Sequence, residues 1–205
     1  MVRSAPLILL SVFFGVGFGW RAWLQRRRFG SSGIMLFRSG RWRQHARESG
    51  LLLLATASFG QAAAALWAPA TVDALRLLLP STTLAWLGTA LMLAGTVVMV
   101  VAQLDMGASW RVGLDDTTRP GVVVGGLYRI CRNPIYVALL VALAGYAALL
   151  PTWLSVAMLA GTSVTVRNQV REEEAHLLRL YGDVYAVYAR RVGRFLPGVG
   201  RLAAH

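Results

Sequence analysis

The sequence predicts an all-α integral membrane protein with about five transmembrane helices, the last two of which form a hairpin that is followed by a cytoplasmic helical tail. Of its 205 residues, 56% are hydrophobic and only 15% are charged, whereas a soluble domain carries about 25% charged residues. Apolar stretches of membrane-spanning length recur along the chain, and arginines gather between them. Because little length remains outside these stretches, we expect residues 1–205 to form a single membrane domain.

The first predicted span is Pro6–Leu24, which is rich in glycine and aromatic residues. A signal peptide would end in small residues at a cleavage site, but arginines follow here, so we expect a transmembrane helix. The next segment, Arg21–Arg47, is the most basic of the chain and has a single acid nearby, Glu48. Such a segment is typical of a cytoplasmic loop, where it orients the chain or contacts anionic lipid headgroups.

Two further spans complete the N-terminal half, residues 1–104. Gly50–Ala68 contains Gln61, and a polar side chain at membrane depth usually faces a neighbouring helix or a cavity. Pro69–Pro80 is expected to be a short loop. The third span, Thr82–Leu104, carries small residues that allow close helix packing. These residues are Gly88, Ala90, Ala94 and Gly95.

A second polar segment, Asp105–Asn133, opens the C-terminal half, residues 105–205. It contains Trp110 and several arginines and acids. Over Thr118–Gly126, Pro120 and the neighbouring valines and glycines favour extended or turn structure over helix.

A hairpin of two short spans follows. Asn133 suits a helix N-cap and Pro134 suits the first helical position. The apolar stretches Ile135–Leu150 and Thr152–Val166 are separated by Pro151. One straight helix over both would be too long for a bilayer of about 30 Å. We therefore expect a tight turn at Pro151, which brings both flanking polar segments to the same side of the membrane.

Five spans place the N-terminus outside and the C-terminus in the cytoplasm of the cell (inner) membrane. The net charge is +12, and the chain contains arginine but no lysine. In this topology all arginines except Arg3 and Arg76 lie on the inner side, as the positive-inside rule requires. Topology thus explains the arginines better than a nucleic-acid partner does. The single cysteine, Cys131, excludes an internal disulfide, and no cysteine–histidine pattern predicts a metal.

From Asn168 onward the chain is predicted to form a helical tail. Glu173 shares one helix face with apolar residues, so it is expected to point inward, while Glu172 is solvated. A buried carboxylate needs a partner, which could be the ammonium group of a ligand or an arginine, namely Arg111, Arg132 or Arg194. Gly182 is expected to break or kink the tail. Aromatic surfaces near the membrane interface are expected from Tyr181, Tyr185 and Tyr188. The face that contains Glu173 consists of Val166, Val170, Glu173, Leu177, Leu180 and Val184.

Several catalytic signatures are missing, since no motif of a zinc protease, a serine hydrolase or a dinucleotide-binding fold stands in a fitting context. What remains is a cytoplasm-facing pocket with extended backbone at Pro120–Gly126, a helix N-terminus at Asn133–Pro134 and the inward Glu173. Free N–H groups at a helix N-terminus bind carboxylates. Extended backbone can bind an adenine edge, and a carboxylate can hold an ammonium group. Together these features suit a zwitterionic, amino-acid-like nucleotide.

These residues follow the order and spacing of a known pattern. The sequence resembles the isoprenylcysteine carboxyl methyltransferase family and its relatives, the membrane phospholipid methyltransferases, over roughly Trp110–Pro197. The residues that carry the resemblance are Gly126, Tyr128, the run Arg132-Asn133-Pro134-Ile135-Tyr136, the run Glu173-Glu174-Ala175-His176-Leu177, Tyr181-Gly182, Tyr185, Tyr188 and Arg194 to Pro197.

The resemblance implies that S-adenosylmethionine is the methyl donor and that the C-terminal half binds it on the cytoplasmic side. The implied cofactor-binding residues are Val122, Val123, Tyr128, Arg132, Asn133, Pro134, Ile135, Tyr136, Glu173, Glu174, Tyr185 and Arg194. The implied catalytic residues are Arg111, Arg167 and Glu173, with Arg111 orienting an anionic acceptor.

The chain departs from the family pattern at two positions. Asn133 stands where the family often has histidine. Gln169 stands where the family often has an arginine that faces the substrate, so Arg167, Arg111 or Arg171 could take its place. This second departure leaves open whether the acceptor is a prenylcysteine carboxylate.

The function expected is therefore methyl transfer to a lipid or hydrophobic small molecule at the cytoplasmic membrane face, without a metal. Phospholipid amines, carboxylates, phenols and thiols all remain possible acceptors. A membrane reductase of the sterol reductase type, which uses NADPH, is one alternative. A non-enzymatic lipid-binding protein, in which Glu173 only forms a structural ion pair, is the other.

Overall fold

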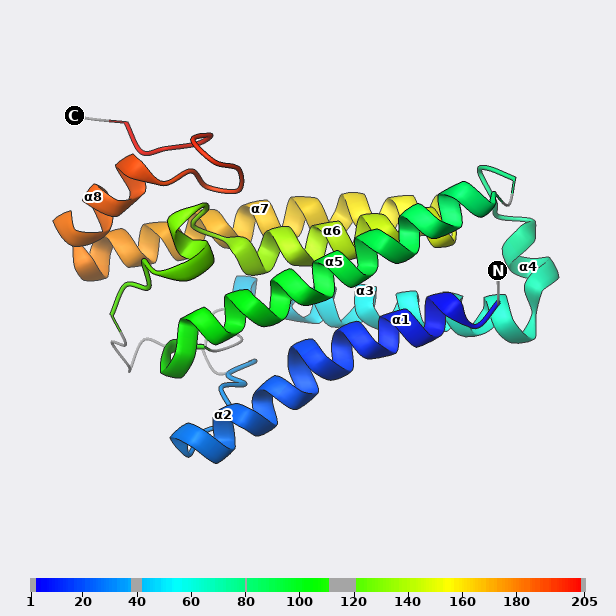
Figure 1. The fold of residues 1–205 in the computed structure, drawn as a ribbon, viewed down its shortest axis with the longest axis horizontal. Coiled ribbons are helices and arrows are strands. Elements are labelled where there is room, and N and C mark those ends of the chain that lie inside the picture. Colours follow the sequence, from blue (N-terminus) through cyan, green and yellow to red (C-terminus); the bar gives the residue numbers. More distant parts are fainter. Residues whose placement is uncertain (1–2, 38–41, 80, 111–120, 204–205) are drawn as a thin grey trace.

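A computed structural model describes residues 3–37, 42–79, 81–110 and 121–203, and over these ranges the chain forms helices and no β-strand. Long helices run along one axis, and the two chain ends lie at opposite ends of the molecule (Figure 1). The helices are α1 (Ala5–Phe14), η1 (Gly15–Trp20), α2 (Arg21–Phe29), α3 (Trp42–Trp67), α4 (Pro69–Asp73), α5 (Thr82–Met106), η2 (Gly107–Ser109), η3 (Gly126–Arg129), α6 (Pro134–Leu149), α7 (Trp153–Tyr181) and α8 (Asp183–Arg191).

The predicted first span continues further than expected, because α1, η1 and α2 follow one another without a break to Phe29. The basic segment predicted as a loop from Arg21 therefore begins as helix. Its first arginine is buried and donates to the Gln25 side chain at 2.7 Å and to the Gly107 carbonyl at 2.7 Å. The glycine-rich η1 is a π-helix, and its Gly17 carbonyl accepts a hydrogen bond from Gln103. These contacts fasten the first helix to the end of α5.

Helices α5 and α6 make the most extensive contact in the bundle. Two of the predicted small residues, Gly88 and Gly95, face α6 directly. A Cβ atom at Gly95 would lie 2.8 Å from the Ala138 carbonyl oxygen, so only glycine allows this approach of the two backbones. The other two, Ala90 and Ala94, are exposed instead.

The predicted turn at Pro151 is confirmed, since α6 ends at Leu149 and α7 begins at Trp153. Thr152 caps α7 by accepting a hydrogen bond from the Ser155 backbone N–H. As expected of a polar residue at membrane depth, Gln61 faces its neighbours: its amide donates to Thr152 and accepts from Tyr146. The loop predicted at Pro69–Pro80 contains the short helix α4, because Pro69 can occupy a first helical turn.

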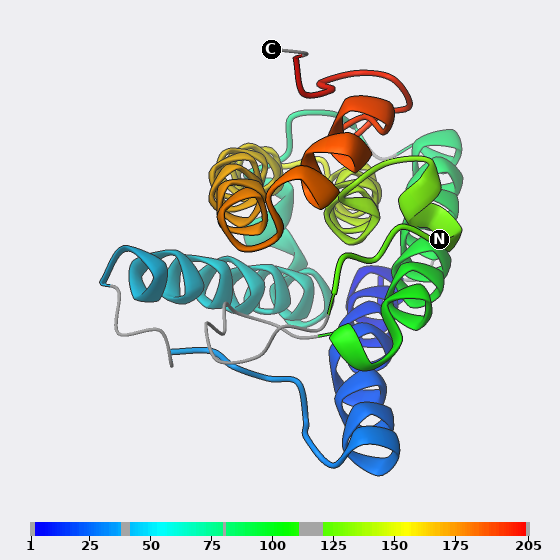
Figure 2. The same ribbon diagram turned by 90° about the vertical axis from the view of Figure 1, so that its left-hand side faces the viewer.

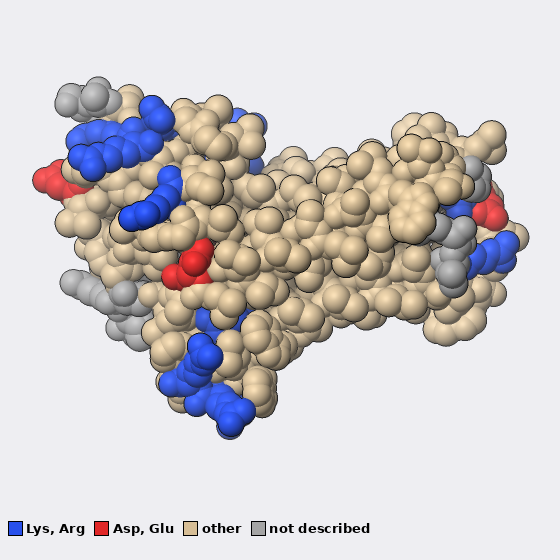
Figure 3. Space-filling model, viewed as in Figure 1, with Lys and Arg blue, Asp and Glu red and all other residues tan. Residues whose placement is uncertain are grey.

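Three helices have the length and composition of membrane spans, namely Ala5–Phe29, Gln44–Trp67 and Thr82–Ser109. Helix α6 is a shorter apolar helix. The apolar first part of α7 and the polar tail are one continuous helix, where the sequence suggested a span followed by a separate tail. Charged side chains gather at the two ends of the molecule and leave an uncharged middle (Figure 3). The fold class is therefore confirmed as an α-helical membrane protein.

The predicted break at Gly182 is also confirmed. Its φ of 50° ends α7 and starts α8, a conformation that glycine adopts easily. The kink turns Val184, which the sequence placed on the packing face, outward to solvent. Tyr185 turns inward and is buried, so it does not form the interfacial aromatic surface that was expected. Helix α8 thereby folds back over the ends of α6 and α7 (Figure 1).

Candidate functional site

The polar residues of the second half meet at one end of the bundle, where the N-terminus of α6 lies beside the last turns of α7. Figure 2 looks onto this end and shows α8 next to both helices and η3 beside α5. The juxtaposition follows from the hairpin: α6 starts where α7 ends, because the two run antiparallel from the turn at Pro151. The expectation that Asn133–Pro134 and the tail carboxylates come together is met.

Glu174 is a buried carboxylate at this end. It receives Nε and Nη2 of Arg132 at 2.9 and 3.1 Å and Nε of Arg194 at 2.9 Å. The side-chain amide of Asn133 donates to the same carboxylate at 3.2 Å. Burial opposes ionisation, but the hydrogen bonds and charges of the two arginines outweigh it and hold the pKa of Glu174 below its usual value.

Arg132 also fastens the chain after α8. Its Nη1 donates to the carbonyls of Ala189 and Val192, and its Nη2 donates to the carbonyl of Gly200. The carbonyls of Ala189 and Val192 lie where α8 ends, and that of Ala189 also accepts from the N–H of Leu202. Since a guanidinium group donates five hydrogen bonds in fixed directions, one buried arginine joins α6, α7 and the C-terminal segment. Glu174, Arg132 and Arg194 are thus paired with one another within the protein.

Glu173 has a different environment. Its Oε1 accepts hydrogen bonds from the hydroxyl of Tyr136 at 2.7 Å and from the amide of Gln169 at 2.8 Å. Both partners are neutral. Of the two partners considered from the sequence, the alternative that Arg132 or Arg194 pairs with Glu173 is therefore wrong, because both reach its neighbour Glu174 instead. Burial raises the pKa of Glu173, and the two hydrogen bonds and the charge of Arg47 oppose that rise only in part.

The segment before α6 lines the same end. Tyr128 is buried, and its carbonyl accepts a hydrogen bond from the hydroxyl of Tyr188. The backbone N–H of Gly121 donates to Tyr181. The carboxylate of Asp105 accepts from the N–H of Leu127 at 2.8 Å and holds η3 against the end of α5. Burial, followed by the nearby charges of Tyr188 and Glu173, raises the pKa of Tyr128, so its phenol stays protonated.

The remaining predicted residues fall into three groups. Val122 and Val123 are half-buried in an irregular stretch, as expected, and Pro134 and Ile135 form the first turn of α6. Asn133 precedes α6 as predicted, but its side chain makes no capping bond because it is turned to Glu174. Arg167 is exposed on α7. Arg111, together with the part of the predicted extended segment before Gly121, lies outside the described residues.

Two side-chain contacts at this end of the molecule were not predicted. Gln169 holds Glu173, and the spacing of four residues on one helix is a signal that could have identified it. Arg47 of α3 lies beside the same carboxylates and pairs with Glu172 at 2.5 Å. No local pattern indicates this contact, since it joins helices far apart in the sequence. Glu172 is exposed, as expected.

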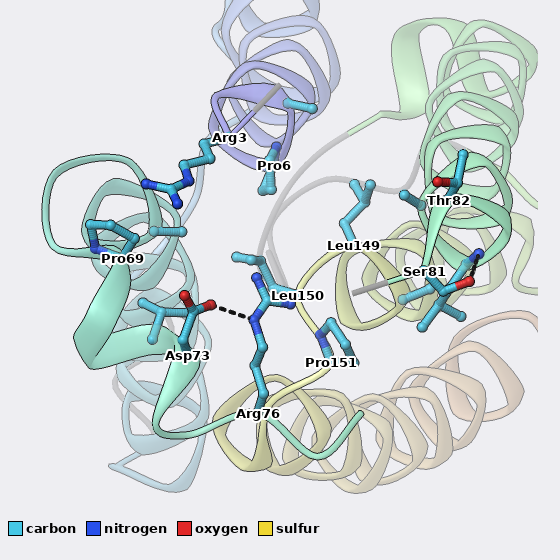
Figure 4. Close-up of a pocket in the computed structure, with 16 residues that line it drawn as sticks. Arg3, Pro6, Pro69, Asp73, Arg76, Ser81, Thr82, Leu149, Leu150 and Pro151 are labelled. Carbon is cyan, nitrogen blue, oxygen red and sulfur yellow. Dashed lines mark hydrogen bonds and ion pairs between the residues drawn. The ribbon is translucent and has the colours of Figure 1, made fainter. Parts of the chain in front are cut away.

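A separate cavity of about 180 Å³ lies at the opposite end of the molecule. Figure 4 shows Arg3 and the ion pair of Asp73 and Arg76 among apolar residues from α1, α5 and the turn at Pro151. None of the predicted site residues lines it. Among the described residues no group of histidines, cysteines and acids could hold a metal ion.

Comparison with known proteins gives this geometry a context. The sequence profile of the family described as phospholipid methyltransferase matches residues 83–184, which comprise α5, α6, α7 and the segment between them. A methanethiol S-methyltransferase from Pseudomonas deceptionensis is 29% identical over 126 residues, or 58% of this chain. The chain spans about half of that relative's length, 46%. Over residues 83–184 the chain is therefore similar to the phospholipid methyltransferases, which confirms the resemblance that its motifs indicated.

Proposed function

We propose that this protein is an integral membrane methyltransferase that uses S-adenosylmethionine and methylates a lipid or hydrophobic small molecule, in the manner of the isoprenylcysteine carboxyl methyltransferases. The observation that carries the proposal is the position of Glu173. It is a half-buried carboxylate with two neutral partners, beside the N-terminus of α6. The family match covers the helices that build this site.

The residues present fit the proposed cofactor. An ionised carboxylate in a partly desolvated site needs a cation, and both described hydrogen bonds of Glu173 go to Oε1. The ammonium group of S-adenosylmethionine would supply that cation. The first turn of α6, Pro134 to Tyr136, would bind the carboxylate of the cofactor. The irregular backbone at Val122 and Val123, with Tyr128 and Tyr185 nearby, would receive the nucleoside.

The cluster of Arg132, Asn133, Glu174 and Arg194 would position these groups. It fixes the start of α6 against α7, and therefore the distance between the α6 N-terminus and Glu173. Preorganised groups of this kind contribute most when they are held by further hydrogen bonds. Single-domain organisation over residues 1–205 is part of the proposal, since helices of both halves reach this end of the molecule.

The chemistry places few demands on the side chains. When bound, S-adenosylmethionine supplies a methyl group on a sulfonium centre that an electron-rich acceptor can attack in line. The protein needs to hold the acceptor opposite the leaving sulfur and to exclude water. No strong base is required if the acceptor arrives as an anion. The names of the matched family and relative support two acceptor classes, phospholipids and small thiols.

We also propose that this end of the molecule faces the cytoplasm of the cell membrane. Arg26, Arg27 and Arg28 of α2 and the arginines of α8 lie at this end, while Arg3 and Arg76 lie at the other. Positive side chains are enriched on the cytoplasmic side of membrane proteins. The N-terminus would then be outside and the C-terminus inside.

The direct test is ligand binding to the detergent-solubilised protein. We expect S-adenosylhomocysteine to bind and NADPH not to bind. Glu173→Gln is expected to lose S-adenosylhomocysteine binding with the fold intact, while Asp183→Asn, which removes an exposed carboxylate at the same end, is expected to keep it. Binding of NADPH alone would support a reductase. A Glu173→Gln variant that changes only stability would support a non-enzymatic role.

A further inference from the structure

A groove opens between α3 and α7 next to Glu173, and Arg171, one of the possible replacements for the substrate-facing arginine of the family, lines it. Its volume is about 340 Å³. One wall comes from the first turns of α3 and the other from one face of α7 just before Glu173. The lining residues are Trp42, Ala46, Arg47, Asn168, Arg171 and Glu172.

Arg47 is the less exposed of the two cations of this groove. Its side chain is 17% exposed, while Arg171 is exposed on α7. One of its Nη groups pairs with Glu172, but its buried Nε has no hydrogen-bond partner among the described residues. A buried donor without an acceptor is rare in proteins. Arg47 is therefore a cation with an unused donor in a groove.

The pair of Arg47 and Glu172 is easily exchanged. The side chain of Glu172 is 50% exposed, so water can replace the arginine as its partner at little cost. An anion that enters the groove could then take the place of Glu172 beside Arg47 and also accept from Nε. Fork-like binding of this kind is typical of arginine with carboxylates.

The groove is also suited to an apolar group. Trp42 is 74% exposed at its rim, and Ala46 leaves space on α3. With two arginines and one acid, the lining carries an excess of positive charge. These features together favour a small anion on an apolar chain over a zwitterion or a neutral lipid.

We propose that this groove admits the methyl acceptor, that the acceptor is an anionic apolar molecule, a thiolate or a carboxylate, and that Arg47 positions its negative charge next to Glu173. The inference rests on the methyltransferase function proposed above and specifies its substrate class. In the reaction the acceptor anion forms the new bond to the methyl carbon while the bond from carbon to the sulfonium sulfur breaks. The sulfur keeps that electron pair, so both charges are neutralised and no further reactant is needed.

Binding of hexanoate and of hexanol to the detergent-solubilised protein, with S-adenosylhomocysteine present, tests the charge preference without requiring turnover. We expect the wild type to prefer hexanoate by about tenfold or more, as a charge-assisted contact would provide, and Arg47→Gln to lose that preference. Arg76→Gln is a matched control, because its pair with Asp73 has nearly the same exposures, 21% and 52% against 17% and 50%, at the far end of the molecule. It should keep the preference.

Glu172→Gln tests whether Arg47 positions the acceptor or only forms a structural ion pair. This variant breaks the pair of Arg47 and Glu172 but keeps the positive charge of Arg47. We expect it to bind hexanoate at least as tightly as the wild type. Equal losses in Glu172→Gln and Arg47→Gln, or a wild type that does not distinguish hexanoate from hexanol, would overturn the proposal. Loss of S-adenosylhomocysteine binding in Arg47→Gln would do so as well, because the arginine would then serve the cofactor.

Transfer of a labelled methyl group to hexanethiol or to hexanoate identifies which anion is the acceptor. For the thiol, removal of Arg47 is expected to shift the rising limb of the pH profile of kcat/KM to higher pH, because the cation favours the thiolate. Among the described residues, the charged groups of α7 that face Arg47 are Glu172, Arg171 and Glu173. Glu48, on its own helix, bonds to Gln44 and to the N–H of Phe37. If the wild type does not bind S-adenosylhomocysteine, that separate result would contradict the proposed methyltransferase function itself.

Discussion

The hydroxyl oxygen of Tyr136 lies 2.7 Å from Oε1 of Glu173, and this hydrogen bond joins the first turn of α6 to the polar part of α7. It places an aromatic donor and a half-buried carboxylate at the N-terminus of a helix. Because Tyr136 follows Pro134 within the same helical turn, the bond also fixes where that N-terminus lies relative to Glu173. The proposed cofactor site depends on this arrangement.

Tyr136→Phe is expected to weaken S-adenosylhomocysteine binding about five- to tenfold, or about 1–1.4 kcal/mol, which is part of the roughly 1.5–3 kcal/mol that a hydrogen bond to a charged group contributes. The protein should remain folded because the ring is retained. Titration of the detergent-solubilised protein measures the loss. An affinity equal to that of the wild type would show that Glu173 does not contact the cofactor or does not need this donor.

The same carboxylate predicts a pH dependence of cofactor binding. Burial raises the pKa of Glu173, and only the ionised form attracts an ammonium group. Binding should therefore weaken as the pH falls through this raised pKa, at a higher pH than for an ordinary glutamate. In Tyr136→Phe the midpoint should move higher still, because a bond that favours the anion is removed. Dissociation constants measured between pH 4 and pH 8 provide the test, and a midpoint as low as that of an ordinary glutamate would contradict the role of Glu173.

Glu174→Gln is expected to destabilise the fold by about 3–5 kcal/mol, because it leaves the buried guanidinium of Arg132 without its carboxylate. The pKa of Glu174 is lowered in the folded protein. Its stabilising contribution is thus present above the unfolded-state pKa and is lost as the pH falls through the folded-state pKa. Thermal unfolding at pH 7 and at low pH measures both effects. A change as small as that of an exposed acid such as Asp183→Asn would contradict this role.

Gly95→Ala tests the packing of α5 on α6. A methyl group there would meet backbone atoms of Ala138 and Ala142 at 2.8 Å, so we expect a loss of about 1–3 kcal/mol. Gly161→Ala is the control, since no atom lies within 4 Å of the added carbon. In that helix interior alanine should stabilise by up to about 1 kcal/mol. Equal melting temperatures for the two variants would contradict this prediction, because α5 and α6 could then move apart without loss of stability.

The orientation of the protein can be measured with single cysteines in a Cys131→Ser background. Leu79→Cys lies at the end that holds Arg76, and Val199→Cys lies at the end that holds Arg132; both positions are exposed. In intact cells a membrane-impermeant maleimide should label the first and not the second. The reverse labelling would place the candidate site outside the cell and contradict the proposed cytoplasmic methyl donor.

Local sequence patterns were enough to predict the all-helical membrane class, the first residues of α5 and α6, the turn at Pro151 and the break at Gly182. Hydrophobicity, proline and glycine act over a few residues, so a local pattern carries this information. Which of the adjacent carboxylates, Glu173 or Glu174, pairs with the arginines depends on the packing of the helices and could be read only from the structure. Side chains of adjacent residues on a helix point in directions about 100° apart. The helical periodicity placed Glu173 on the buried face, but Arg132 and Arg194 bind Glu174. The contact of Arg47 with α7 could not be predicted either, because it depends on how helices that are far apart in the sequence pack together.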